Sequence, residues 1–366
     1  MRVAYITRTT YGVLGGGASY FFPEKISQFA EVMVIAPTPK KSNEKVIMPV
    51  GRVRVCSVPA GQGEDALYQV YRLLADFRPD VVHVFHSPNC LFYVKKLKCL
   101  LPGAKWVLDF RSPPIISAWR DRIRVRFRYF ACQMLYDHIF THSHRTIGQN
   151  LPLRIRRVRE VCPGVELASI GGRRGSCGGS PERFVYIGSV TASRRLDILV
   201  DAFIAWSRQL RKPVRLDIYG AGNALDELRA RVSQAGGESS VVFHGAIDQQ
   251  SLLEKLPSYD VGVAYVPDDL FAKAPSLKSL EYAAAGIRIL ASDTVGHRDY
   301  AKRFGFQFAF FRNDIRSIVA ALDRIYCEFE SLSDPAVNLR CVERFDWSSI
   351  VRDQLLPAYK EMTQHD

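Results

Sequence analysis

Short apolar segments alternate with helix-like stretches along the first half of the sequence. The predicted strands are Arg2–Thr7, Val32–Ala36, Val53–Val58, Val81–Phe85, Lys105–Phe110 and His138–His142. The predicted helices between them are Ala18–Phe29, Glu64–Phe77, Cys90–Leu100 and Trp119–Tyr136. Several strands are apolar on both faces, as a parallel sheet covered by helices requires. The order therefore predicts a doubly wound α/β domain.

The same alternation restarts after a glycine-rich break, where six of the twenty residues 164–183 are glycine. The strands predicted beyond it are Arg183–Ile187, Val214–Tyr219, Ser240–Phe243, Val261–Tyr265, Ile287–Ala291 and Phe306–Phe310. The helices are Leu196–Gln209, Ala224–Gln234, Gln249–Leu256, Leu277–Ala285 and Ile315–Tyr326. We predict two Rossmann-like domains, 1–165 and 183–347, joined by a linker over 166–182. A last helix within 348–366 is expected to cross back to the first domain.

Composition narrows the class of protein. No apolar run reaches the roughly 18 residues that span a bilayer, and the first residues, MRVAYIT, form an apolar strand without the features of a signal peptide. The eight cysteines include no CxxC pair and no zinc-like spacing. We expect a cytoplasmic protein with reduced thiols and no metal cofactor.

The formal charge of +13 is concentrated in one segment. Residues 120–159 hold ten arginines against Asp121 and Asp137, a balance of +8. Such a surface favours an anionic partner, although a solvated face with no partner stays open. Locally the arginines alternate as in a strand, but an apolar stripe at helical spacing and the strand that follows favour a helix. We expect the basic segment 119–159 to meet an anionic membrane surface, and no nucleic acid, because no module signature is present.

Two loops carry residues suited to phosphate. After the first strand, Gly16 and Gly17 end a glycine run that opens a helix, whose free N–H groups suit an anion. A dinucleotide fingerprint is absent, because Tyr20 stands where glycine is needed. In the second half, a loop ending at Ser276 opens a helix that has Lys278 in its first turn. The helix dipole disfavours a cation there, and a bound anion would explain it.

The segment APSLKSLEYAAAGIRILAS, residues 274–292, resembles the retaining GT-B glycosyltransferases of family 4. That resemblance covers nearly the whole chain and implies two facing domains with a central cleft. In the family, two glutamates precede small residues, a glycine and a strand. Lys273 stands at the position of the first glutamate. The second glutamate matches Glu281, and the resemblance implies that Glu281 accepts hydrogen bonds from the ribose hydroxyls. The helix start at Ser276, Leu277 and Lys278 would hold the diphosphate.

Other positions of the second domain extend the resemblance. In FVYIGSVTASRRLDILVDAF the family's glycine matches Gly188, and Ser189 replaces its arginine. The downstream cation matches Arg194, aided by Arg195, and arginine suits a diphosphate through bidentate contacts. LDIYGAGN matches the family's Tyr-Gly-x-Gly at Gly220, and a loop ending at Ile247 would flank the base.

The first domain is implied to bind the acceptor. Arg111 stands where many members carry a histidine that contacts the sugar, and Asp109 lies two residues earlier. These residues form either an acceptor site or a structural pair. His86, at the end of PDVVHVFH, is a further candidate acceptor contact.

The resemblance therefore implies a metal-independent hexosyltransferase that retains configuration. It would move a sugar from a nucleotide-sugar donor to a saccharide or lipid-linked acceptor in polysaccharide or glycolipid synthesis. Such an enzyme is expected in the cytoplasm or peripherally on the cytoplasmic face of the membrane. The alternatives are a non-catalytic or weakened scaffold, motivated by Ser189, Lys273 and Arg111, and a nucleotide-sugar epimerase of the same fold.

Overall fold

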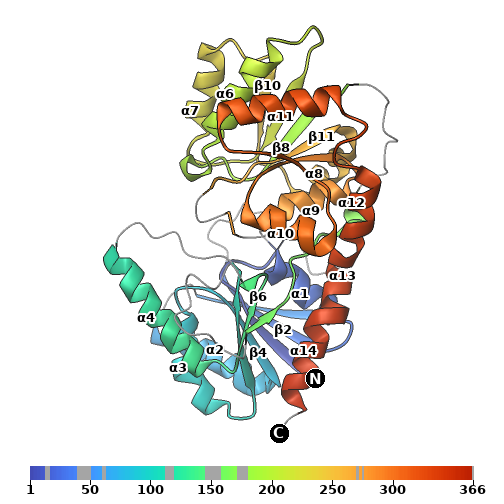
Figure 1. Cartoon of the computed structure of the whole chain (residues 1–366). Coiled ribbons are helices and arrows are strands. Elements are labelled where there is room, and N and C mark those ends of the chain that lie inside the picture. The colour runs from blue at the N-terminus through green and yellow to red at the C-terminus, as the bar shows by residue number, and fades with distance from the viewer. Residues whose placement is uncertain are drawn as a thin grey trace. The chain divides into compact units, whose positions relative to one another are not determined.

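The computed structural model describes residues 1–12, 17–38, 51–59, 63–111, 119–144, 158–170, 180–268, 272–273 and 276–364. It divides into two compact units (Figure 1). Unit 1 comprises Met1–Gly164 with Trp347–Asp366, and unit 2 comprises Val165–Asp346. Unit 1 therefore includes the last helical segment together with Trp347, which we predicted in the second domain. Val165, which we predicted in the first domain, and residues 166–170 of the predicted linker belong to unit 2, and residues 171–179 lie outside the described ranges.

Unit 1 is built on a seven-stranded parallel sheet of order β3-β2-β1-β4-β5-β6-β7. Its strands are β1 (Arg2–Ile6), β2 (Glu31–Pro37), β3 (Val53–Val58), β4 (Val81–Phe85), β5 (Lys105–Phe110), β6 (His138–Thr141) and β7 (Val158–Glu160). Its helices are α1 (Ala18–Ile26), α2 (Glu64–Phe77), α3 (Cys90–Leu97), the 3₁₀ turn η1 (Lys98–Leu100), α4 (Trp119–Leu135), α13 (Trp347–Ile350), the π-helical turn η6 (Val351–Leu355) and α14 (Leu356–Thr363).

Successive side chains of the buried strands point to opposite faces of this sheet. In β1, Val3 and Tyr5 join one apolar cluster, whereas Ala4 and Ile6 join another. The first cluster is completed by α1 and by the segments after Trp347. Side chains of α2, α3 and α4 complete the second cluster. The sheet is therefore covered on both faces, which explains its continuously apolar strands.

Unit 2 carries a six-stranded parallel sheet of order β10-β9-β8-β11-β12-β13. Its strands are β8 (Arg183–Ile187), β9 (Arg215–Tyr219), β10 (Val241–Gly245), β11 (Val261–Ala264), β12 (Arg288–Ser292) and β13 (Ala309–Phe311). Its helices are α6 (Leu196–Ser207), α7 (Leu225–Gln234), α8 (Gln249–Lys255), α9 (Leu277–Ala284), α10 (Val295–Phe304), α11 (Ile315–Cys327) and α12 (Pro335–Val342). Short 3₁₀ turns are η2 (Leu167–Ser169), η3 (Ala192–Arg194), η4 (Leu256–Ser258) and η5 (Glu343–Phe345).

In both sheets the order of strands reverses next to the first strand of the unit. In unit 1 the reversal lies between β1 and β4, and in unit 2 it lies between β8 and β11. In open α/β sheets, ligands bind outside the carboxyl ends of the strands at such a switch point. The functional site is therefore sought where β8 and β11 end, and where β1 and β4 end.

Candidate functional site

The turn after β8 brings the ends of two strands into close contact. Gly188 has a φ of +141° and Gly220, after β9, has a φ of +152°. A Cβ built on Gly220 would lie 1.8 Å from the carbonyl oxygen of Gly188, so no side chain fits there. The Gly188 N–H donates to the carbonyl of Tyr219. Because both predicted positions are glycine, no side chain covers the backbone at the carboxyl end of β8 there.

Helix α9 is fixed against this turn by Tyr282. The Ile187 N–H donates to the Tyr282 hydroxyl at 3.0 Å, and that hydroxyl donates to the Val185 carbonyl at 3.3 Å. The ring leaves no room for a side chain at position 262, because a Cβ on Gly262 would lie 2.3 Å from it. The start of α9 therefore sits at the carboxyl ends of β8 and β11, the switch point of the unit 2 sheet.

Lys278 lies at this switch point. Its Nζ donates to the Tyr265 carbonyl at 3.2 Å and lies 4.3 Å from the centroid of the Tyr186 ring. A Cβ on Gly188 would lie 3.3 Å from the same Nζ. Burial, together with the positive charge of Arg194, lowers the pKa of Lys278 to about 7. The free protein therefore holds a cation that an anion at the same place would stabilise.

Glu281 lies one turn further along α9 and is half-buried. Gln249 Nε2, from the first residue of α8, donates to its Oε1 at 3.4 Å. Burial raises the pKa of Glu281 to about 7, against the opposing effects of Gln249 and Lys278. Arg194 Nε donates to Ser189 Oγ at 3.1 Å and is near enough to shift the pKa of Lys278. The structure thus brings Arg194, Lys278 and Glu281 together in unit 2.

The start of α9 has polar groups that the described part of the protein does not use. Ser276 occupies the N-cap position, yet its side chain makes no capping hydrogen bond. Within the described ranges, the buried hydroxyls of Ser276 and Ser279 have no hydrogen-bond partner. The N-terminus of α9 therefore offers backbone N–H groups and positive potential to a ligand, and two buried hydroxyls lie in its first turn. Leu277, the first residue of the helix, is exposed.

Three other residues predicted for the donor site are Arg195, Ile247 and Lys273, each in a different loop of unit 2. Arg195 adopts a left-handed conformation at the start of α6, and its exposed guanidinium donates to Asp197 through Nε and Nη2. Ile247 is half-buried just before α8. Lys273 follows Ala272, whose carbonyl accepts from the Gly296 N–H. The guanidinium of Arg195 is thus held in a local ion pair with Asp197.

The predicted glycine loop of unit 1 is described only in part. Gly16 lies outside the described residues. Gly17 is the N-cap of α1, and among the described residues no atom lies within 4 Å of a Cβ built on it. Gly17 thus lies at the β1 side of the unit 1 switch point.

The predicted acceptor residues form a buried chain of polar contacts. Asp109 is fully buried, and Arg111 donates to it through Nε at 2.7 Å and Nη2 at 3.1 Å. Arg111 Nη1 donates to the Val161 carbonyl at 2.9 Å. His83 Nε2 lies 3.1 Å from Asp109 Oδ2, and the pKa of Asp109 falls well below its ordinary value because Arg111 and His83 stabilise the carboxylate against the opposing effect of burial. Arg111 and Asp109 are thus a structural pair, and their contact with substrate stays a prediction.

The His86 N–H donates to the Asp109 carbonyl at 2.9 Å, but the His86 side chain has a different partner. It is half-buried after β4, and its Nε2 lies 2.9 Å from the Tyr129 hydroxyl of α4. Burial and the positive charges of Arg8 and Arg128 lower the pKa of His86 to about 4. The imidazole is therefore neutral at physiological pH, which suits a hydrogen-bonding residue. Its contact with an acceptor stays a prediction.

Sequence reasoning missed the supporting residues of the unit 2 site. Tyr186 lies two positions before Gly188, and strand periodicity places both on the same face. Gln249 follows Ile247 by two positions, so the loop prediction stopped just short of it. Nothing in the sequence indicated that the Tyr265 carbonyl would accept from Lys278. That contact arises because β11 ends beside the start of α9.

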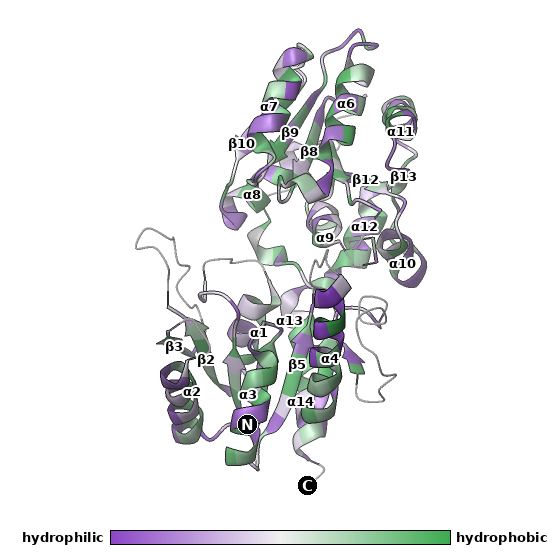
Figure 2. Ribbon diagram, turned by 90° about the vertical axis from the view of Figure 1, so that its left-hand side faces the viewer, coloured by the Kyte–Doolittle hydropathy of each residue, from purple (hydrophilic) through white to green (hydrophobic). Residues whose placement is uncertain are grey.

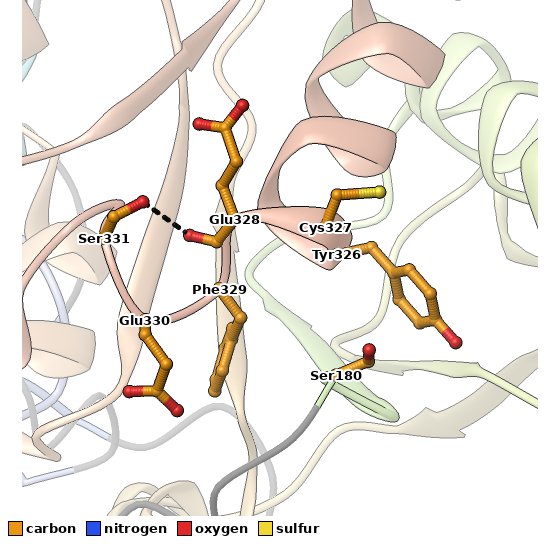
Figure 3. Close-up of a pocket in the computed structure, with 7 residues that line it drawn as sticks. All are labelled: Ser180, Tyr326, Cys327, Glu328, Phe329, Glu330 and Ser331. Carbon is orange, nitrogen blue, oxygen red and sulfur yellow. Dashed lines mark hydrogen bonds between the residues drawn. The ribbon is translucent and has the colours of Figure 1, made fainter.

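Among the described residues, no group of three or more His, Cys, Asp or Glu side chains could hold a metal ion. A shallow pocket of unit 2 (Figure 3) is lined by Ser180, Tyr326, Cys327, Glu328, Phe329, Glu330 and Ser331. None of these is a predicted site residue. No helix in the described part of the chain is long and apolar enough to cross a bilayer.

Known proteins share this architecture. HepE from Anabaena, in complex with UDP and glucose, matches with a TM-score of 0.77 at 13% identity over 99% of this chain and 100% of its own. Sucrose-phosphate synthase from Thermosynechococcus elongatus matches with 0.75 at 14%, over 100% of both chains. The lipopolysaccharide outer core galactosyltransferase WaaB matches with 0.65 at 15%, over 98% of this chain and 100% of its own. These likenesses confirm the predicted GT-B fold of two Rossmann-like domains.

Within unit 2 the sequence also matches a known family. Residues 181–328 match the family described as "Glycosyl transferases group 1". No curated protein sequence matches the chain. The family match covers β8 through α11 and so includes Arg194, Lys278 and Glu281. The family match therefore concerns unit 2, whereas the likeness to solved structures shows the GT-B fold of the whole chain.

Proposed function

We propose that this protein is a retaining hexosyltransferase that moves a sugar from a nucleoside-diphosphate sugar to a saccharide or lipid-linked acceptor. The observation that carries the proposal is the grouping of Arg194, Lys278 and Glu281 at the switch point of the unit 2 sheet. Two cations beside a helix N-terminus suit a diphosphate. A carboxylate one turn along suits the ribose hydroxyls.

The proposed roles follow from what each group can do. The N–H groups at the start of α9 and the ammonium of Lys278 bind the diphosphate oxygens. Arg194 adds a second cation to the charge that develops on the leaving nucleoside diphosphate, which is the largest contribution in such transfers. Gly188 and Gly220 let the backbone approach the phosphates closely. We propose that no metal cofactor takes part, because these groups already supply positive charge.

The acceptor and the place of action are proposals of the same kind. Lys273 and Ser189 are expected near the donor sugar and diphosphate, and His86 near the acceptor. WaaB acts on lipopolysaccharide, by its name, and a glycolipid acceptor fits a protein that works at a membrane surface. We propose polysaccharide or glycolipid synthesis in the cytoplasm, with peripheral contact to anionic lipid through the basic segment 119–159.

Nucleotide binding by the Glu281→Ala variant tests the proposal. Loss of the charged hydrogen bonds to the ribose is expected to weaken binding of the preferred nucleotide by about 1–3 kcal/mol. Calorimetry with UDP, GDP and ADP measures this. Glu254→Ala, which removes a carboxylate from the exposed face of α8, is the matched control. Equal affinity of the Glu281 variant and the parent protein for all three nucleotides would refute the role of Glu281.

A weakened or non-catalytic scaffold is the second candidate, and Arg111 favours it. All three nitrogens of its guanidinium donate to protein oxygens, on Asp109 and on the carbonyls of Val161 and Cys162. An assay with a panel of nucleotide sugars separates the candidates. A scaffold binds nucleotide without releasing sugar, a transferase needs acceptor for turnover, and an epimerase converts donor without any acceptor.

A further inference from the structure

Helix α4 carries its largest apolar side chains on the face that points away from unit 1. Its buried residues are Tyr129, Cys132 and Gln133. The exposed apolar residues are Trp119 (65% exposed), Ile123 (45%), Phe127 (71%), Phe130 (43%) and Met134 (65%). At 100° per residue these five fall within an arc of about 80°, whose centre lies opposite Cys132, about 120° from Tyr129 and about 80° from Gln133. We call this set the outer stripe.

Contacts to α3 and to His86, the residue after β4, fix the inward face of α4 and so keep the outer stripe exposed. The sulfurs of Cys90 and Cys132 lie 3.8 Å apart, both buried. The Tyr129 hydroxyl lies 2.9 Å from His86 Nε2. The Tyr136 hydroxyl, just after the helix, donates to the Cys90 carbonyl at 2.7 Å. A surface helix of a soluble domain presents polar residues outward, whereas α4 presents an apolar stripe.

Arginines border the outer stripe on both sides. Helical spacing places Arg126 and Arg120 at its two edges, with Arg122 and Arg124 next to them. The only acidic residue of α4 is Asp121. Figure 2 shows hydrophobic and hydrophilic residues interleaved along this helix. An apolar face with a cationic rim is the pattern of a helix that lies in the interface of an anionic membrane.

We propose that α4 lies in the plane of an anionic lipid surface, with the outer stripe inserted below the headgroups and its arginines on the lipid phosphates. The inference deepens the proposed membrane contact and rests on that part of the proposed function. The proposed function names only a contact between basic residues and anionic lipid, and the inference adds insertion of the five apolar side chains of the outer stripe. A second copy fits the same face poorly, because an isologous contact would bring two arginine rims together.

Trp119 makes the proposal directly measurable. The chain has four tryptophans. Trp106, Trp206 and Trp347 are 0%, 0% and 1% exposed, and only Trp119 is accessible. Its emission and its quenching by acrylamide therefore report on the outer stripe, while the other three stay shielded.

The first experiment adds vesicles of phosphatidylcholine, with or without phosphatidylglycerol, to the full-length protein. With phosphatidylglycerol we expect a blue shift of Trp119 emission, and loss of its acrylamide quenching. Phosphatidylcholine alone should give a weaker response. Added salt should weaken binding without abolishing the shift of the bound protein, because the inserted side chains do not depend on charge.

Matched variants separate apolar insertion from charge. Phe127→Ser with Met134→Ser is expected to lower vesicle affinity about ten- to hundredfold, because two inserted apolar side chains are lost. Tyr68→Ser, at a 60% exposed position of α2, should leave affinity unchanged. Arg122→Gln and Arg124→Gln should each lower it about fivefold, on anionic vesicles only. UDP binding by every variant should equal that of the parent, which distinguishes loss of membrane contact from failure of the nucleotide site.

Three outcomes would overturn the inference. Vesicles that pellet the protein without shifting Trp119 emission would place the contact elsewhere. Absence of binding to all vesicles, with UDP binding intact, would leave the outer stripe without a lipid partner. A blue shift that grows with protein concentration in the absence of lipid, with a matching rise in mass by light scattering, would assign the stripe to a second copy or another protein surface.

Discussion

At the scale of single residues, unit 2 holds two ionisable groups near neutrality within one turn of a helix. Burial moves the pKa of Lys278 down and that of Glu281 up, each to about 7. Burial disfavours the charged form of each, and their mutual attraction only partly opposes it. A bound diphosphate would favour the charged lysine. Ligand binding and proton binding at Lys278 should therefore be coupled.

We predict that UDP binding takes up a proton at pH values somewhat above 7. There the free Lys278 is mostly neutral, whereas the diphosphate raises its pKa in the complex. The neighbouring Glu281 is mostly ionised at that pH, so it does not cancel the uptake. Affinity should fall as the pH rises from about 7 toward about 9. Calorimetry in two buffers of different ionisation enthalpy measures the uptake.

Lys278→Arg is the control for this prediction, because its guanidinium stays charged throughout. The variant should bind UDP with little proton uptake and with a flatter dependence on pH. Identical uptake by the variant and the parent would show that another group titrates.

The sequence could supply the charged residues of the site but not the groups that hold them. Arg194, Lys278 and Glu281 stand in recognisable loop and helix patterns. The hydroxyl of Tyr282, the carbonyl of Tyr265 and the ring of Tyr186 contribute through tertiary contacts that no local pattern encodes. Arg111 illustrates the reverse case. Its position suggested an acceptor contact, and only the structure showed its guanidinium surrounded by protein oxygens.

At the scale of elements, the segment after Trp347 is as much a part of unit 1 as its own strands. The Trp347 ring stacks on Phe21 at a centroid distance of 5.2 Å and meets Phe22 edge-on at 5.7 Å. The Tyr359 hydroxyl lies 2.7 Å from His83 Nδ1 and 3.1 Å from the Tyr5 hydroxyl. Trp347 and Tyr359 are 1% and 0% exposed, so both rings anchor this segment in the core of unit 1.

Replacement of Trp347 by alanine should destabilise the protein strongly. Loss of a fully buried ring leaves a cavity, and we expect a cost of about 3–5 kcal/mol. Urea unfolding followed by circular dichroism measures it. Trp119→Ala, at an exposed position, should cost less than about 0.5 kcal/mol. A cost below about 1 kcal/mol for Trp347→Ala would mean that the helix is not an integral part of unit 1.

Most strands and helices were predictable because their apolar patterns are strong, and the misses have physical reasons. The short strand β7 at the sheet edge has three half-buried residues, so it shows no apolar run. Helix α10 was missed because VGHRDYAKRF is polar except at a few positions. Helix α12 has an equally weak pattern. The predicted last helix is interrupted by a π-helical turn at Val351–Leu355, next to Pro357.

At the scale of the whole molecule, two units each carry their own sheet, their own switch point and their own apolar core. The proposed nucleotide-binding residues Arg194, Lys278 and Glu281 come from unit 2, whereas the buried Asp109–Arg111 pair and α4 belong to unit 1. The architecture followed from the alternation of strands and helices. That the two sheets face a shared cleft stays a prediction.

Hydrogen exchange with UDP tests this division of labour. Amides at 188–194 and 276–281 should exchange more slowly in the complex, since they border the proposed diphosphate and ribose. Those of α4 should be unaffected by UDP alone. Protection confined to the turn at Gly17, with no change after β8, would place nucleotide binding in unit 1 and contradict the prediction.

The discontinuous make-up of unit 1 has a consequence for how the chain matures. Residues 347–364 leave the ribosome only after all of unit 2 has been synthesised. Until then one face of the β1–β4 region lacks Trp347 and Tyr359, and its apolar side chains stay open to solvent. Unit 2 is continuous and can complete its fold first. The nascent amino-terminal portion is therefore the part that most needs a chaperone while it waits for its last helix.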